Sequence, residues 1–62
     1  MKITKDQILP GAVFNTKIGE VKIKTIDKDG YKKGCDRVNT ELFGKPYSDT
    51  KSEIVSFINQ NL

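Results

Sequence analysis

The chain has 62 residues and a mass of 7.0 kDa, and 35% of its residues are hydrophobic. A chain this short buries only about 60% of its unfolded surface, so we expect one small domain over residues 1–62. One cysteine excludes an internal disulfide, and the lack of histidine excludes an ordinary zinc cage, so no metal or cofactor is expected. The apolar runs are too short for a membrane span or a signal peptide, which predicts a cytoplasmic protein with no membrane partner.

The charge is distributed unevenly along the chain. Ten lysines and one arginine oppose eight acidic residues, which gives a net charge of +3. Residues 1–35 carry +4 and residues 36–62 carry −1. This asymmetry predicts one electropositive face that attracts a nucleotide or nucleic acid, and a merely solubilising surface is the alternative. Because lysine is a point charge, we expect charge-driven binding with little base specificity.

The N-terminal segment contains a helix-start pattern. Thr4 and Gln7 have the spacing of a capping box, which predicts a short helical turn over residues 5–8. Pro10 and Gly11 then end any helix. Residues 12–16 are a plausible first strand, and a turn containing Gly19 follows.

Residues 20–27 alternate between apolar and charged side chains, which is the strongest strand signal in the chain. One face would carry Val21, Ile23 and Thr25, and the other Lys22 and Lys24. Ile26 breaks the alternation, which indicates a bulge or a strand end that is buried on both faces.

The next segments are turns and weaker strands. The run Asp27 to Gly30 is typical of a tight turn. Residues 31–42 are predicted to be extended, either as one long bent strand or as two strands split near Gly34. A further turn is expected at residues 43–46.

The C-terminal segment is the clearest helix, predicted over residues 51–61. Thr50 and Glu53 form a second capping-box pattern, and Ile54, Ile58 and Leu62 recur every four residues. A helix this short needs a surface to pack on. We therefore expect an α+β fold: a small twisted antiparallel sheet of three or four strands with one C-terminal helix packed on it. An open barrel is the more curved alternative.

The residue types favour binding over catalysis. Without histidine the usual general base is missing, and Cys35 has no histidine to activate it, so no enzymatic activity is expected. Lysines on the sheet combined with an aromatic ring are typical of small β domains that hold anionic ligands. The predicted ligand-binding residues are Lys22, Lys24, Tyr31, Lys32, Lys33 and Arg37, with Lys32 and Lys33 near Lys22 and Lys24 across the hairpin.

Self-association is also predicted. The aromatic and aliphatic side chains exceed what one helix and one thin sheet cover, and neither a disulfide nor a metal compensates for a small core. A homo-oligomer is the remaining common solution.

In length and in its lysine-, isoleucine- and asparagine-rich composition, the chain resembles the very small accessory proteins of bacteriophages and mobile elements. That resemblance implies an inhibitor or sponge that acts on a host defence factor or its nucleotide signal. Two other classes stay open: a nucleic-acid-binding accessory domain, and a protein-interaction adaptor that binds a host protein through an apolar patch or a free strand edge.

Overall fold

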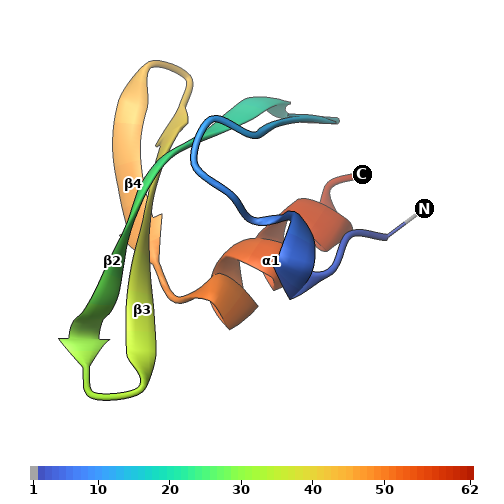
Figure 1. The fold of residues 1–62 in the computed structure, drawn as a ribbon. Helices are drawn as coiled ribbons and strands as arrows, with labels where there is room; N and C mark the ends of the chain where they lie inside the picture. The colour runs from blue at the N-terminus through green and yellow to red at the C-terminus, as the bar shows by residue number, and fades with distance from the viewer. Residues whose placement is uncertain (1) are drawn as a thin grey trace.

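Four antiparallel strands and one α-helix form the main elements of the computed structural model, which describes residues 2–62 (Figure 1). The elements in chain order are η1 (Lys5–Gln7, a 3-10 turn), β1 (Val13–Thr16), β2 (Gly19–Lys32), β3 (Cys35–Leu42), β4 (Lys45–Asp49) and α1 (Lys51–Gln60). The strand order is β1-β2-β3-β4, so β1 and β4 are free edges and the sheet is open. The predicted α+β class, with the C-terminal helix on one side of an antiparallel sheet, is confirmed.

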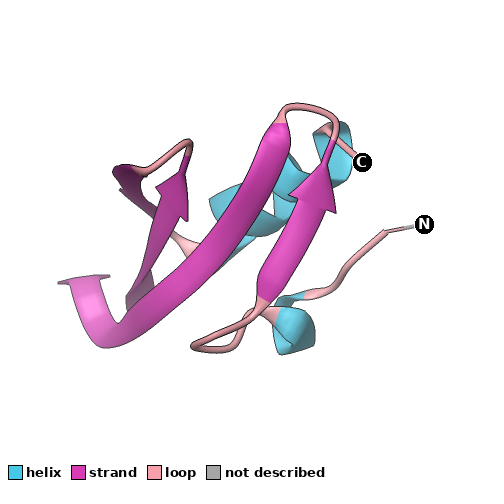
Figure 2. Cartoon of the chain, turned by 90° about the horizontal axis from the view of Figure 1, so that it is seen from above, coloured by secondary structure: helices cyan, strands magenta, loops and turns pink. Residues whose placement is uncertain are grey.

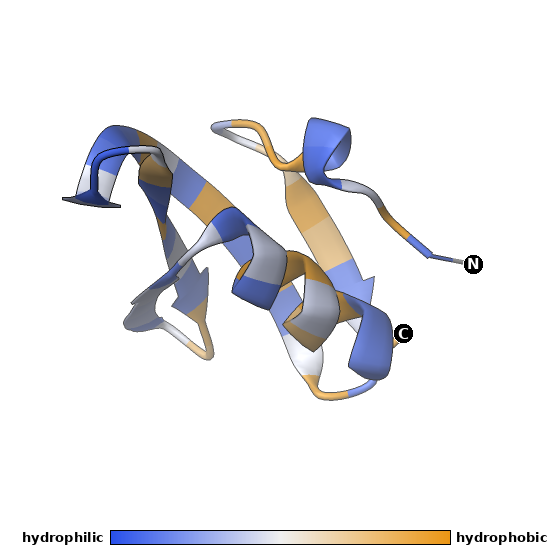
Figure 3. Cartoon of the chain, turned by 90° about the horizontal axis from the view of Figure 1, so that it is seen from below, coloured by the Kyte–Doolittle hydropathy of each residue, from blue (hydrophilic) through white to orange (hydrophobic). Residues whose placement is uncertain are grey.

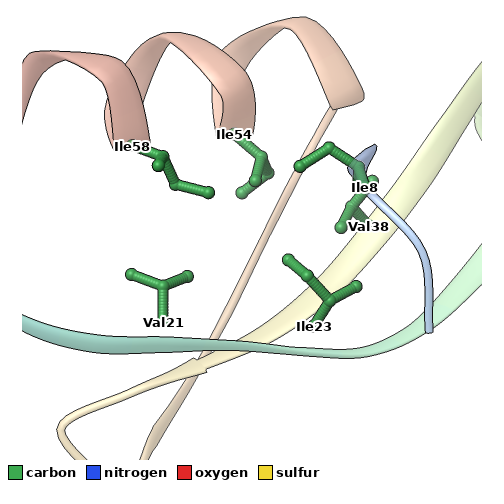
Figure 4. Packing of buried hydrophobic residues seen from close by; sticks show 6 residues of the cluster. All are labelled: Ile8, Val21, Ile23, Val38, Ile54 and Ile58. Atoms are coloured by element: carbon green, nitrogen blue, oxygen red, sulfur yellow. The ribbon is translucent and has the colours of Figure 1, made fainter. Parts of the chain in front are cut away.

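The core lies between one face of the sheet and α1. Its buried members come from the N-terminal segment, from β2 and β3, and from the helix (Figure 4): Ile8, Val21, Ile23, Val38, Ile54 and Ile58. Apolar and polar positions are interleaved along β2 and α1 because only one side of each faces this core (Figure 3). No helix or strand within residues 2–62 covers the opposite sheet face, which is called the outer face below (Figures 1 and 2).

The bulge indicated by Ile26 is present in β2. Ile23 lies opposite Thr40 and Thr25 lies opposite Asn39, so Lys24 is an extra residue in β2. An extra residue reverses the inward–outward alternation. Ile26 consequently packs against the core cluster and lies opposite buried Val38.

The prediction of a tight turn at Asp27–Gly30 is wrong. β2 continues to Lys32, and the chain reverses at Lys33 and Gly34, where Gly34 has a φ of +85°. The split near Gly34, one of the two alternatives for residues 31–42, is therefore confirmed. The turn-forming residues instead build a second irregularity: β2 takes five steps from Asp27 to Lys32 while β3 takes two between their partners.

The turn expected at residues 43–46 is shorter in the structure. Phe43 and Gly44 make the reversal, with φ values of +56° and +75°, and the chain re-enters the sheet at once as β4. β4 was not among the predicted strands. Thr40, buried in β3, anchors it by donating its hydroxyl to the Tyr47 carbonyl oxygen at 2.7 Å.

Both predicted helix starts are close to their expected positions. The Gln7 Oε1 accepts the Thr4 amide at 2.8 Å, as a capping box requires. At α1, the Thr50 hydroxyl accepts the Glu53 amide at 3.2 Å, whereas the Thr50 amide donates to Asp49 Oδ1 at 2.8 Å and leaves the Glu53 carboxylate out of the box. The ten-residue α1 is far shorter than a bilayer-crossing helix, and residues 2–62 contain no helix with the length and apolar character for such a crossing.

Candidate functional site

The two predicted lysines on the outer face each lie beside a carboxylate. Lys22 Nζ is 3.7 Å from Glu20 Oε1, and Lys24 Nζ is 3.5 Å from Glu41 Oε2. Exposed ion pairs of this kind contribute only about 0–1 kcal/mol to stability. They do cancel the local positive charge, so this half of the outer face is not the free lysine row that the sequence indicated.

The structure also separates the predicted lysines into two places. Lys22 lies opposite Glu41 in the middle of the sheet, whereas Lys32 lies opposite Cys35 beside the β2–β3 turn. The expectation that Lys32 and Lys33 approach Lys22 and Lys24 is therefore wrong. The reason is the position of the reversal: β2 runs on to Lys32, so Lys32 and Lys33 lie at its far end, ten residues along the chain from Lys22.

Tyr31 and Arg37 do come together on the outer face. The Arg37 guanidinium carbon lies 4.8 Å from the centre of the Tyr31 ring, which is the geometry of a cation–π contact. The Tyr31 hydroxyl reaches across β3 and donates to the Ser48 carbonyl oxygen at 3.0 Å. Tyr31 is 44% exposed and Arg37 is exposed, so the stacked pair is open to solvent.

A polar network supports this pair from the neighbouring strands. The Asn39 side-chain amide donates to Thr25 Oγ1 and to Asp27 Oδ2, both at 3.0 Å. Its oxygen accepts the Ser48 hydroxyl at 2.7 Å. Because Ser48 also holds the Tyr31 hydroxyl through its carbonyl group, the network fixes β2, β3 and β4 relative to the ring.

The irregular end of β2 brings Tyr31 over Arg37. Asp29 has a φ of +55°; its amide donates to Asp36 Oδ1 at 3.0 Å and its carboxylate accepts the Gly34 amide at 2.7 Å. A Cβ on Gly30 would lie 2.7 Å from the Arg37 Cβ, closer than such atoms approach in real structures. Glycine is required here because the β2 backbone passes directly against Arg37.

The cations near this pair lack carboxylate partners. Among the described residues, no carboxylate oxygen lies within 4.0 Å of the charged nitrogens of Lys28, Lys32, Lys33 or Arg37. The three nearby acids bond to other groups, namely Asp27 to Asn39, Asp29 to Gly34, and Asp36 to the Asp29 amide and, at 3.9 Å, to Lys51. They keep their negative charge, so the four cations and three carboxylates at this end of the hairpin sum to +1. We call Tyr31, Arg37 and these three lysines the Tyr31–Arg37 site.

Two shallow cavities lie elsewhere on the molecule. One, of about 200 Å³, is bordered by Phe43 and Gly44 with three charged residues of β2 and β3. The other, of about 180 Å³, lies between Cys35 and the first residues of α1. Small-molecule sites usually enclose about 300–1,000 Å³. Neither cavity includes a member of the Tyr31–Arg37 site, whose residues are all exposed.

Tyr47 has a pKa above its ordinary value. Partial burial raises the pKa above 10.0, and the 3.1 Å hydrogen bond to Asp49 and the charge of that carboxylate raise it further. Because the folded pKa exceeds the unfolded one, this contribution to stability is fully present below about pH 10. It is lost as the pH rises through the folded pKa.

We expect a Tyr31→Phe variant, in which Tyr47 is the one remaining tyrosine, to ionise above pH 10 in an absorbance titration near 295 nm. Adding Asp49→Asn should lower that pKa part of the way, because burial is the larger cause. An unchanged pKa in the double variant would contradict the role of Asp49.

The sequence analysis predicted Tyr31, Arg37 and the lysines as binding residues, but it did not predict that Asn39 and Ser48 support the Tyr31–Arg37 pair. Both are ordinary polar side chains, and their pairing depends on the β3–β4 register, which places Asn39 opposite Ser48. Short strand 45–49 carries little periodic signal, so this register was not visible in the sequence. Comparisons with family models, with curated proteins and with solved structures give no match to this chain.

Proposed function

We propose that this protein is a non-enzymatic binding protein that holds an anionic partner at the Tyr31–Arg37 site. The observation that supports the proposal most is the environment of Arg37. Its guanidinium rests on an aromatic ring rather than on a carboxylate, so its N–H donors stay available to a phosphate group. The hydrogen bond from Tyr31 to Ser48 holds the ring, and so reduces the entropy lost on binding.

The neighbouring lysines support the same proposal. Lys28, Lys32 and Lys33 are exposed and belong to the same end of the β2–β3 hairpin. Several cations without carboxylate partners at one end of a hairpin attract an anion jointly, and the attraction weakens as salt is added. Lys22 and Lys24 are not part of the proposed site, because each lies beside a glutamate. They serve as the control in the test below.

The test compares two double variants that remove the same charge. We expect Lys32→Gln/Arg37→Gln to weaken the binding of inorganic polyphosphate at least tenfold, since a hydrogen bond to a charged group contributes about 1.5–3 kcal/mol. Lys22→Gln/Lys24→Gln should weaken it by less than about threefold, as expected for exposed paired charges. Isothermal titration calorimetry measures both, and matching thermal midpoints show that both variants fold.

Equal losses in the two double variants would reduce the effect to net charge and would contradict a localised site. No loss in either would favour the adaptor alternative. For that alternative, exposed Phe43 and Val13 are the natural contacts, since both are apolar and lie outside the core.

Several narrower expectations stay predictions: action on a host defence factor or its nucleotide signal, assembly into a homo-oligomer, and a cytoplasmic location. For the sponge hypothesis, we expect the pocket for a nucleotide to form between copies of the chain, because the two cavities described above are small and shallow. The mass of the protein in solution at micromolar concentration tests the homo-oligomer directly.

A further inference from the structure

We infer that the anionic partner is a single-stranded nucleic acid, with one base stacked at Tyr31 and Arg37 and the adjoining phosphates near Lys28, Lys32 and Lys33. This inference rests on the proposed function and names its ligand class.

The shape of the site favours a polymer over a free nucleotide. A small ligand gains its affinity from a concave pocket that buries most of its surface. The Tyr31–Arg37 site is instead an exposed aromatic–guanidinium pair on an uncovered sheet face, and both cavities lie elsewhere. A single-stranded nucleic acid does not need a pocket, because its successive phosphates contact several cations at once.

The chemistry of the pair favours a base as the contacting group. Unpaired bases stack on aromatic rings and on guanidinium planes, and such stacking accepts every base. Tyr31 is 44% exposed, and its hydroxyl is already used in the bond to the Ser48 carbonyl group. With the hydroxyl engaged and Arg37 over one ring face, the rest of the ring and the guanidinium plane are the groups left to a ligand, rather than a free hydroxyl.

The charges around the pair favour phosphate contacts without sequence readout. The three lysines are point charges that do not match the paired acceptors of guanine, unlike a bidentate arginine. A duplex is disfavoured because its bases are stacked on one another and cannot reach Tyr31. We therefore expect sequence-tolerant binding of single strands.

The first experiment measures fluorescence anisotropy with labelled oligodeoxythymidylate and oligouridylate of about 12 nucleotides, within the range that one small domain contacts. We expect binding of at least one, and affinity about 5- to 150-fold lower for an abasic strand with the same phosphates, the equivalent of losing one stacked base. The logarithm of the affinity should fall with the logarithm of salt with a slope of about 0.7 per phosphate contacted. A duplex that binds as tightly as the single strand would overturn the inference.

The second experiment isolates the ring. Tyr31→Leu should reduce oligonucleotide affinity to that of the abasic strand, whereas Tyr31→Phe, which keeps the ring and loses the bond to Ser48, should retain most of it. Equal losses in the two variants would assign the effect to the hydroxyl and would overturn the stacking. Tyr31 lies outside the core, so both variants should fold, which far-ultraviolet circular dichroism checks.

The two proposals fail in different ways. If polyphosphate and the abasic strand bind as tightly as the oligonucleotide, and Arg37→Gln weakens all three, the anion site stands and the nucleic-acid inference falls. If neither Arg37→Gln nor Tyr31→Leu changes the binding of any of these probes, both fall.

Discussion

Ile8→Ala is expected to leave the protein largely unfolded at 25 °C. Ile8 is 0% exposed, and in Figure 4 it lies beside Ile54 of α1 and above Ile23 of β2. Truncating such a side chain costs about 2–5 kcal/mol, because the lost apolar contacts leave a cavity. A core in a domain of this size rarely supplies more than about 3–5 kcal/mol in total. The measurement is urea denaturation followed by circular dichroism.

The neighbouring residue is a matched control. Leucine is an isomer of isoleucine, so Leu9→Ala removes the same number of carbon atoms at the adjacent position. Leu9, however, is 59% exposed. Its free energy of unfolding should change by less than about 0.5 kcal/mol. Similar destabilisation in the two variants would mean that the N-terminal segment does not seal the core as the structure indicates.

The architecture was predictable because it depends on patterns that operate over a few residues. The apolar stripe of α1 and the alternation in β2 each identify the face that must be buried, and two such faces in one short chain have to meet. The position of Ile26, out of phase with Val21 and Ile23, indicated either a bulge or a strand end buried on both faces. The structure has the bulge and places it at Lys24.

The hairpin position was not predictable from the same kind of pattern. Asp27–Gly30 and Lys33–Gly34 both contain residues that favour turns, and the sequence offers no local reason to choose the second. The structure uses the first run differently, since the Asp29 carboxylate bonds to the Gly34 amide across the real turn. That contact exists only after the strands have paired, so its energy has no signature in a short window of sequence.

The position of the β2–β3 reversal decided which of the predicted binding residues lie together. The reversal lies nearer the C-terminus than predicted, so Lys22 and Lys24 are separated from Lys32 and Lys33. The same position brings the irregular end of β2 against Arg37. The prediction that cations and a tyrosine bind the ligand came from residue types alone and did not require the strand register. Their grouping depends on register, and for that reason four of the six predicted residues lie together at one end while two lie apart and paired with acids.

Asn59→Ala is expected to release the N-terminal segment from α1. Asn59 holds Ile3 in both directions: its Oδ1 accepts the Ile3 amide at 2.8 Å, and its Nδ2 donates to the Ile3 carbonyl oxygen at 3.1 Å. The alanine leaves two partly buried backbone groups without partners, at a cost of about 1–3 kcal/mol for each group left unsatisfied. The readouts are the thermal midpoint and the hydrogen-exchange rate of the Ile3 amide, which should rise.

Two further variants separate the hydrogen bonds from helix propensity and charge. Gln60→Ala, at the next and exposed position of α1, should change the free energy of unfolding by less than about 0.5 kcal/mol. Asn59→Asp keeps the acceptor for the Ile3 amide but sets a negative oxygen against the Ile3 carbonyl group, so it should destabilise despite its nearly identical size. An Asn59→Asp protein as stable as the parent would show that the Nδ2 bond contributes nothing to anchoring the segment.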